Sequence, residues 1–211
     1  MTFLFTDFEG IDGSGTSTHV HRLEERIENF NKYQSVLRTH EPWRSGDIKI
    51  KLEQDFDSYS GGLEMAEMYV LDRAEHVRQL IRPVANAGVV VLNSRYKMST
   101  CAYQWVQGVP LEDLLAMHEH RALLTPDLTF FLDVPREVAE ERIRSTRSKR
   151  EKFEKDPEFV DRLISAYRVL VGMSEVDSRI FGKVVRIDGN RPTEEVTDEI
   201  FEEFLKIYSS S

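Results

Sequence analysis

Short apolar segments alternate along this chain with longer segments of helical periodicity. Several of the short segments are apolar throughout, as expected for strands that are buried on both faces of a parallel sheet. We predict strands at residues 3–8, 35–39, 88–93, 128–133 and 184–187. Because strands that alternate with helices form parallel sheets, the pattern predicts an α/β fold, with a five-stranded parallel sheet flanked by helices on both faces.

Apolar residues recur at every third or fourth position in the longer segments, which indicates helices with one buried face. The predicted core-facing sets are Val20, Leu23, Ile27 and Phe30, then Met68, Leu71, Val77 and Ile81, and finally Val196, Ile200, Phe204 and Tyr208. Residues 45–62 show no clear periodicity. We interpret them as a short helix followed by a mobile Gly-Gly turn.

The size and composition of the chain favour one domain over residues 1–211, because 211 residues with 40% hydrophobic content can bury one substantial core. Cys101 is the single cysteine, so no internal disulfide is possible, and we expect a reducing, cytoplasmic setting. The longest apolar runs are far shorter than the roughly 20 residues of a membrane helix. The first residues show no signal-peptide pattern.

Charge is distributed unevenly. The net charge of −9 argues against a general nucleic-acid surface, since binding a phosphate backbone requires clustered cations. One basic segment stands out, with Arg142, Arg144, Arg147, Lys149, Arg150, Lys152 and Lys155. Such a segment is typical of a solvated helical face, but it could also supply cations to a phosphate group.

A glycine-rich loop, GIDGSGTST at residues 10–18, lies between the first predicted strand and the first predicted helix. Glycines there let successive backbone N–H groups converge on one anion at the positive end of the helix. The predicted phosphate-binding residues are Gly10, Asp12, Gly13, Ser14, Gly15, Thr16, Ser17 and Thr18. The pattern GxxxxGK[ST] requires lysine where Thr16 stands. Losing that cation could cost about 3 to 4 kcal/mol, or on the order of a hundredfold in rate.

Five segments in order resemble those of thymidylate kinases: FEGIDGSGTST, THEPWRS, VLDRAEH, SRYKMSTCAYQ and FLDVPREVAEERI. The resemblance spans nearly the whole chain. It implies a P-loop NTPase fold with a short basic lid at about residues 142–155, transfer of the γ-phosphate of ATP to dTMP, Mg²⁺ bound with ATP, and a homodimer.

The resemblance also implies roles for individual residues. The acceptor-binding candidates are Asp12, Arg44, Tyr69, Arg73, Arg95, Ser99, Thr100, Tyr103 and Gln104. The catalytic candidates are the cations Arg95, Arg147 and Arg150, and the metal candidates are Ser17 and Glu9. For Glu9, a hydrogen bond that supports the loop is an equally good interpretation.

Tyr69 and Arg73 are four residues apart and share a helical face. By resemblance, the ring of Tyr69 stacks on thymine and Arg73 hydrogen-bonds a base carbonyl, while Tyr103 packs against the sugar and disfavours a 2′-hydroxyl. The alternatives are core packing for Tyr69 and an exposed loop position for Arg44. His118 and His120, on a polar helix, are predicted to be surface residues.

Two departures from the family pattern leave the activity open. Thr16 replaces the loop lysine, and Ser94 replaces the aspartate that usually precedes Arg95. We therefore consider an active dTMP kinase in which lid arginines replace the lysine, a nucleotide-binding pseudokinase, and a kinase for another deoxynucleotide.

Overall fold

The computed structural model describes residues 4–55, 57–121, 123–146 and 152–209. These residues form five strands in one parallel sheet with the order β2-β3-β1-β4-β5. The strands are β1 (Phe5–Glu9), β2 (Val36–His40), β3 (Val90–Ser94), β4 (Leu128–Asp133) and β5 (Lys183–Asp188). The predicted parallel sheet is confirmed, with strand ends that differ by at most two residues from the prediction.

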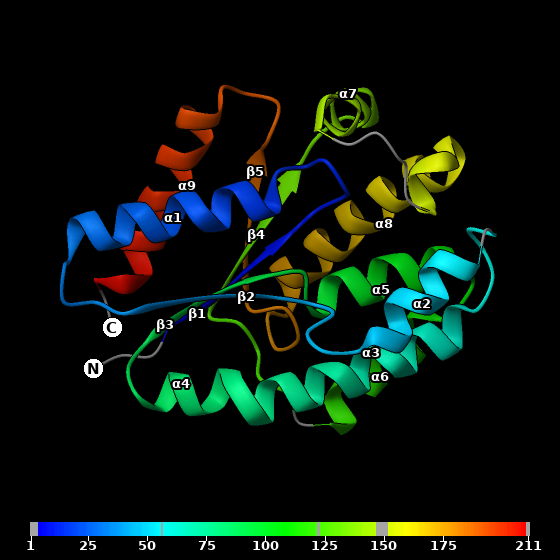
Figure 1. The fold of residues 1–211 in the computed structure, drawn as a ribbon, viewed down its shortest axis with the longest axis horizontal. Helices are drawn as coiled ribbons and strands as arrows, with labels where there is room; N and C mark the ends of the chain where they lie inside the picture. The colour runs from blue at the N-terminus through cyan, green and yellow to red at the C-terminus, as the bar shows by residue number, and fades with distance from the viewer. Residues whose placement is uncertain (1–3, 56, 122, 147–151, 210–211) are drawn as a thin grey trace.

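Helices cover both faces of the sheet (Figure 1). On one face lie α1 (Thr16–Phe30) and α9 (Thr193–Tyr208). On the other side lie α3 (Gly62–His76), α5 (Lys97–Val106), α6 (Leu111–His120) and α8 (Pro157–Val176). The remaining helical segments are α2 (Gly46–Gln54), the π-helical η1 (Val77–Ile81), α4 (Arg82–Asn86), α7 (Arg136–Thr146) and the 3₁₀ segment η2 (Phe153–Lys155). The short helix predicted within residues 45–62 is α2, and Gly61 and Gly62 begin α3.

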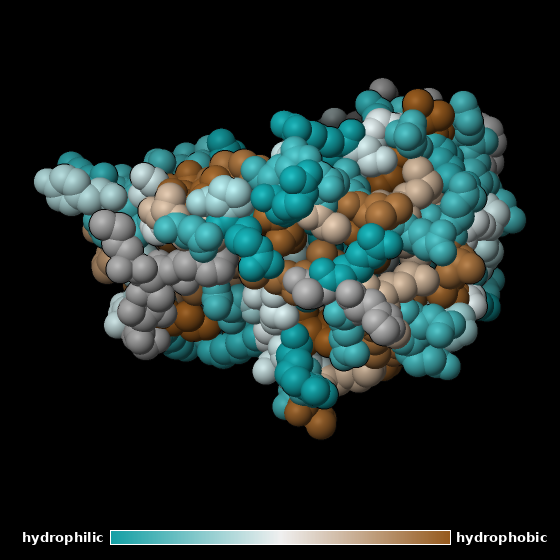
Figure 2. Space-filling model, turned by 90° about the horizontal axis from the view of Figure 1, so that it is seen from below, coloured by the Kyte–Doolittle hydropathy of each residue, from teal (hydrophilic) through white to brown (hydrophobic). Residues whose placement is uncertain are grey.

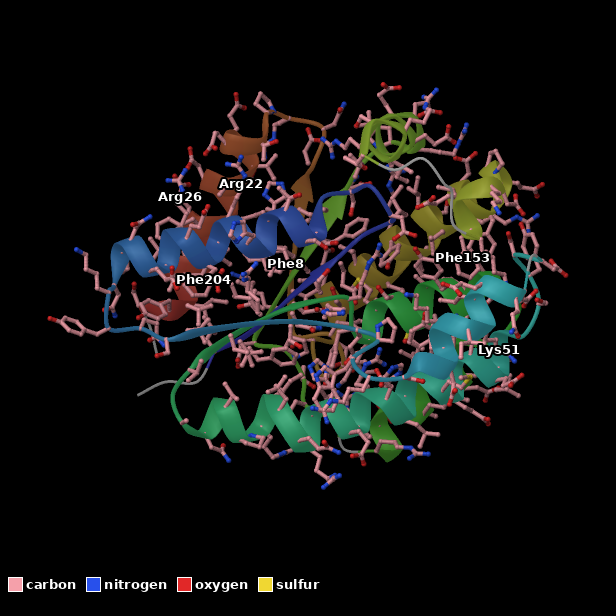
Figure 3. The ribbon with its side chains drawn as sticks, in the orientation of Figure 1. Phe8, Arg22, Arg26, Lys51, Phe153 and Phe204 are labelled. Carbon is pink, nitrogen blue, oxygen red and sulfur yellow. The ribbon has the colours of Figure 1, made fainter. Side chains whose placement is uncertain are left out.

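The core follows the two faces of the strands. Phe8 packs with Leu23 and Phe204 on the side of α1 and α9, whereas Phe5 packs with Val77 on the opposite side. This alternation is expected, since successive side chains of a strand point to opposite faces. Figure 3 shows Phe8 and Phe204 in the layer between the sheet and these two helices.

Two of the predicted core positions are wrong. Phe30 is 58% exposed, because it lies at the end of α1, where its ring meets those of Phe201 and Tyr208 on α9 edge to face. Leu71 is 50% exposed, because the buried face of α3 includes Val70 rather than its neighbour.

The carboxyl ends of the strands meet at one edge of the sheet. The glycine loop follows β1, Arg95 follows β3, and Gly189 follows β5. In open α/β sheets ligands bind at this edge, outside the carboxyl ends of the strands. Among the described helices, none is both long and apolar enough to cross a membrane.

Candidate active site

The glycine loop joins β1 to α1 through two glycines with left-handed backbone. Gly13 has φ 79° and Gly15, the N-cap of α1, has φ 102°. A Cβ at Gly13 would lie 2.5 Å from the carbonyl oxygen of Ala139, so the loop packs directly on α7. The loop therefore needs glycine at position 13 both for its conformation and for its packing.

A cavity of about 490 Å³, which we call the glycine-loop cavity, opens at the start of α1. Its lining includes six of the eight predicted phosphate-binding residues, namely Asp12, Gly13, Gly15, Thr16, Ser17 and Thr18. Gly10 and Ser14 are buried and do not belong to the lining. The Ser14 hydroxyl is buried and has no hydrogen-bond partner among the described residues.

Three described arginines line the glycine-loop cavity: Arg95, Arg142 and Arg191. Arg142, on α7, donates to the carbonyl of Ser14 at 3.3 Å and to that of Gly189 at 2.8 Å. It therefore ties α7 to the glycine loop and to the end of β5. The predicted catalytic residues Arg147 and Arg150 lie outside the described residues.

His19 also lines this cavity, on the first turns of α1. Burial, with a smaller contribution from Arg22, lowers the pKa of His19 to about 4. Its Nδ1 lies 3.1 Å from the hydroxyl of Thr197 on α9. The imidazole is therefore neutral near pH 7 and adds no positive charge beside the loop.

A second cavity of about 220 Å³, which we call the aromatic cavity, adjoins the first. It is lined by Asp12, Glu41, Pro42, Leu52, Met65, Tyr69, Arg73, Arg95, Tyr96, Ser99, Thr100, Tyr103, Gln104 and Phe153. The structure thus brings together all the predicted acceptor-binding residues except Arg44. Phe153, from η2, lies between α8 and the helices α2 and α5 (Figure 3), and its ring meets that of Tyr103 edge to face at 5.1 Å.

Arg44 lies outside both cavities. Its guanidinium lies over the ring of Trp43 at 4.1 Å, and its side chain is exposed. The carboxylate of Asp72 accepts hydrogen bonds from the backbone N–H groups of Trp43, Arg44 and Ser45, which holds the loop and turns the Arg44 side chain outward. This is the exposed loop position weighed as the alternative for Arg44.

Arg73 is only 1% exposed and sits at the centre of a buried network. Its Nε donates to Glu41 at 2.7 Å, and its Nη2 donates to the carbonyl of Tyr96 at 2.9 Å and to the hydroxyl of Thr100 at 3.0 Å. Its Nη1 lies 2.7 Å from His118 Nε2. Four of the five N–H groups of the guanidinium thus have partners.

His118 is not a surface residue as predicted but is 2% exposed. Its Nδ1 lies 2.7 Å from the carbonyl of Leu114, so Nδ1 carries the proton and Nε2 accepts from Arg73. Burial, and then the charge of Arg73, lower its pKa well below the usual value. The His120 side chain lies outside the described part of the structure. The prediction failed because the residues that follow His118 in the sequence are polar, although α6 packs against α3 and α5.

Arg95 stands where the two cavities meet, and it lines both. Its Nη2 lies 2.6 Å from Asp12 Oδ1, and its Nη1 donates to the hydroxyl of Tyr167 at 3.2 Å. Its φ of 71° is unusual for a residue with a side chain. Such strained backbone persists where the surroundings hold it, often at functional sites.

Glu9 is fully buried at the end of β1. Its carboxylate accepts hydrogen bonds from the backbone N–H groups of Tyr96 at 2.9 Å and Ser99 at 3.0 Å, and from the hydroxyls of Ser99 and Tyr167. These donors lie at the start of α5 and on α8, so Glu9 holds the start of α5 rather than the glycine loop. Ser17, by contrast, is exposed at the mouth of the glycine-loop cavity.

A parallel sheet with a glycine loop at a helix start and two adjoining cavities is typical of P-loop nucleotide kinases. The family model described as thymidylate kinase matches residues 8–200. The chain is 32% identical to a probable thymidylate kinase of Methanosarcina mazei, over 94% of this chain and 93% of the relative. It is 36% identical to one of Thermococcus kodakarensis, over 70% and 75%. It is 30% identical to a thymidylate kinase of Leptospira interrogans, over 96% and 94%. The chain belongs to the thymidylate kinase family and is an ATP-dependent nucleoside monophosphate kinase.

Proposed function

We propose that this chain itself transfers the γ-phosphate of ATP to dTMP, giving dTDP and ADP, although Thr16 replaces the loop lysine. The observation that carries the proposal is the pair of adjoining cavities, which share Asp12, Glu41 and Arg95. A monophosphate on a nucleoside in the aromatic cavity would reach Arg95, where it would meet the triphosphate on the glycine loop.

The aromatic cavity suits a pyrimidine deoxynucleotide. The rings of Tyr69 and Tyr103 supply flat apolar walls, and base stacking on such rings is favourable. Arg73 offers one N–H to a carbonyl of the base, and the unpartnered Oε1 of Gln104 can accept from a ring N–H. Tyr103 against the sugar would leave no room for a 2′-hydroxyl. Thymine has both the carbonyls and the N–H that these groups require.

The glycine-loop cavity suits the phosphates of ATP. Backbone N–H groups of residues 13–18 at the start of α1 would bind the phosphate oxygens, because the helix terminus is positive. Arg142, and the lid residues Arg147 and Arg150, would supply the cations that Thr16 does not.

Magnesium fits this cavity through few protein ligands. Mg²⁺ in such sites is usually held by one or two protein oxygens together with substrate phosphates. The hydroxyl of Ser17 and the carboxylate of Asp12 provide hard oxygen donors at the cavity surface. The ion would neutralise phosphate charge there. Glu9 is less suitable, because four donors already occupy its carboxylate.

The reaction needs no general base from the protein. The acceptor phosphate is already anionic, so direct in-line transfer requires alignment of the two nucleotides and stabilisation of charge. Arg95 would align the acceptor phosphate, and Asp12 would hold Arg95 in place through their 2.6 Å contact.

We also propose a homodimer that forms through the outer face of α3. Leu63 and Leu71 are eight residues apart on that face, and they are 54% and 50% exposed. Figure 2 views the molecule from the side of α3 and α4 and shows apolar patches among polar side chains. Exposed apolar patches of this kind mark protein contacts. Analytical ultracentrifugation should find a dimer for the wild type and a monomer for Leu71→Arg.

A coupled assay of ATP consumption with each nucleoside monophosphate tests the activity. We expect turnover with dTMP that exceeds turnover with UMP and dCMP. Tight dTMP binding without turnover would instead identify a nucleotide-binding pseudokinase, which is the alternative that Thr16 and Ser94 favour. A preference for another deoxynucleotide would overturn the choice of acceptor.

A further inference from the structure

Gln104, which lines the aromatic cavity, has one amide atom without a hydrogen-bond partner among the described residues. The residue lies on α5, lines the cavity and is 2% exposed. Its Nε2 donates to Gln107 Oε1 at 3.0 Å. Its Oε1 is buried and has no hydrogen-bond partner among the described residues. A buried acceptor without a partner is costly, so this atom is suited to a donor on a bound ligand.

The orientation of the Gln104 amide is set from the far side of Gln107. Gln107 Nε2 donates to the backbone carbonyls of Ser58 at 3.0 Å and Ser60 at 2.9 Å. Carbonyl oxygens can only accept, so Gln107 must turn its NH₂ group to them. Its Oε1 is then an acceptor, to which Gln104 must turn its own NH₂ group. Two backbone carbonyls therefore fix the Gln104 oxygen as the atom of the amide that is left for a ligand.

A glycine makes this contact possible. Gly62, at the start of α3, is buried against Gln107, and a Cβ there would lie 2.8 Å from the Cβ of Gln107 and 3.0 Å from a methyl of Val109. With no side chain at position 62, Gln107 approaches the turn at residues 58–60 closely enough to bond both carbonyls. The carbonyls of Ser58 and Ser60, before α3, thus set the orientation of the Gln104 amide through Gln107.

We propose that Gln107 is a positioning residue that sets base selectivity at the acceptor site. This inference rests on the proposed function and deepens it. A pyrimidine with a protonated N3, such as thymine, can donate to the fixed Gln104 oxygen. Cytosine has a bare N3, which is itself an acceptor, so two acceptors would face each other in a buried site. A site built to bond one group rejects the analogue that lacks it.

Two substitutions of Gln107 separate positioning from general support. Gln107→Leu removes both the donor and the acceptor, which frees the Gln104 amide to turn its NH₂ group into the cavity. Gln107→Glu loses the bonds to residues 58–60 but keeps an acceptor opposite Gln104 Nε2. The orientation of Gln104 should therefore survive in Gln107→Glu and be lost in Gln107→Leu.

The measurement is the ratio of kcat/KM for dTMP to that for dCMP. We expect this ratio to fall about tenfold in Gln107→Leu, mainly through KM for dTMP, and to stay within about threefold of the wild type in Gln107→Glu. Equal losses for both nucleotides in Gln107→Leu, or an equal change of the ratio in both variants, would overturn the inference. If the wild type shows no turnover, the proposed function fails, and the ratio of dissociation constants from calorimetry tests Gln107 with the same expectations.

Discussion

The two cavities of the site are built in different ways. The aromatic cavity is shaped by side chains that other side chains hold in place, as His118 and Glu41 hold Arg73 and as Gln107 holds Gln104. The glycine-loop cavity is shaped by backbone at the start of α1, and its described cations are Arg95 after β3, Arg142 on α7 and Arg191 before α9. The side chains proposed to bind the base are therefore held by neighbouring side chains, whereas the charges proposed to neutralise the transferred phosphate come from several separate segments.

The departures from the family pattern fall on one side of this comparison. Thr16 and Ser94 line the glycine-loop cavity and are absent from the lining of the aromatic cavity. A change in either cavity should consequently affect a different kinetic constant: the acceptor KM on the aromatic side, and turnover on the glycine-loop side.

The lid arginines should give the largest effect. Arg147→Ala or Arg150→Ala should nearly abolish turnover, because we expect Arg142 alone not to replace the charge of the missing loop lysine. Thr16→Lys should raise turnover by on the order of 10²-fold and make the lid deletions less costly. The measurement is kcat at saturating dTMP and Mg·ATP. Arg144→Ala, exposed on α7 and paired with Glu141, is the control. Turnover that survives both lid deletions would refute this compensation.

Arg95 links the two cavities, so its loss should affect both. Arg95→Ala should lower kcat/KM for dTMP by on the order of 10³-fold, because a charge-assisted contact to phosphate is lost at the point of transfer. Steady-state kinetics measure this, with Arg179→Ala as a control whose side chain is 83% exposed. A loss below tenfold would place Arg95 outside the reaction centre.

Replacing Arg73, which lines the aromatic cavity, should weaken both the binding of dTMP and the stability of the fold. Arg73→Ala should weaken dTMP binding by about 1.5 to 3 kcal/mol and leave ATP affinity nearly unchanged. It should also lower the free energy of unfolding by about 3 to 5 kcal/mol, because Glu41 would remain buried with only the imidazole of His76 beside it. Calorimetry and urea unfolding measure the two effects. Equal losses of dTMP and ATP affinity would make Arg73 a purely structural residue.

The smallest effect should be on the pH dependence of stability. The pKa of His118 lies well below its usual value in the fold, so below about pH 6.5 the unfolded chain binds a proton that the folded chain does not. Stability is therefore fully present above about pH 6.5 and falls with pH below it, by at most about 1.4 kcal/mol per pH unit for one histidine.

His118→Gln keeps an acceptor for Arg73 but cannot titrate. Urea unfolding from pH 7 to pH 5 should show a shallower loss of stability for this variant than for the wild type. His19, whose pKa is lowered to about 4, should keep part of the pH dependence in both proteins. Identical slopes for the two proteins would mean that His118 is protonated in the fold.

The sheet and most residues of the aromatic cavity could be predicted from the sequence. The physical reasons for this also explain why other positions were predicted wrongly. Strands such as β4 are buried on both faces, so their apolar runs are visible without knowledge of the fold. The turn of Arg44 away from the cavity depends on Asp72, 28 residues along the chain. The burial of His118 likewise depends on Arg73, 45 residues away.

Two residues at the site, of which only Phe153 lines a cavity, gave no usable signal in the sequence. Phe153 lies in the basic segment and Tyr167 within an ordinary helical pattern, yet they contact Tyr103 and Arg95 respectively. Only packing between distant segments brings them to the site. Glu41 was visible in the segment THEPWRS, but its role as the partner of Arg73 requires the fold.

The left-handed backbone at Arg95 limits how many destabilising substitutions the rest of the chain can tolerate. A non-glycine residue in this conformation costs of order 1 to 3 kcal/mol, while a whole domain is stable by only about 5 to 15 kcal/mol. The fold therefore has a smaller reserve against destabilising substitutions elsewhere than a relaxed backbone would leave it. β-Branched residues at position 95 would add further strain. Selection for stability alone would favour glycine or asparagine there, so retention of arginine in the chain's descendants would record continuing selection for function.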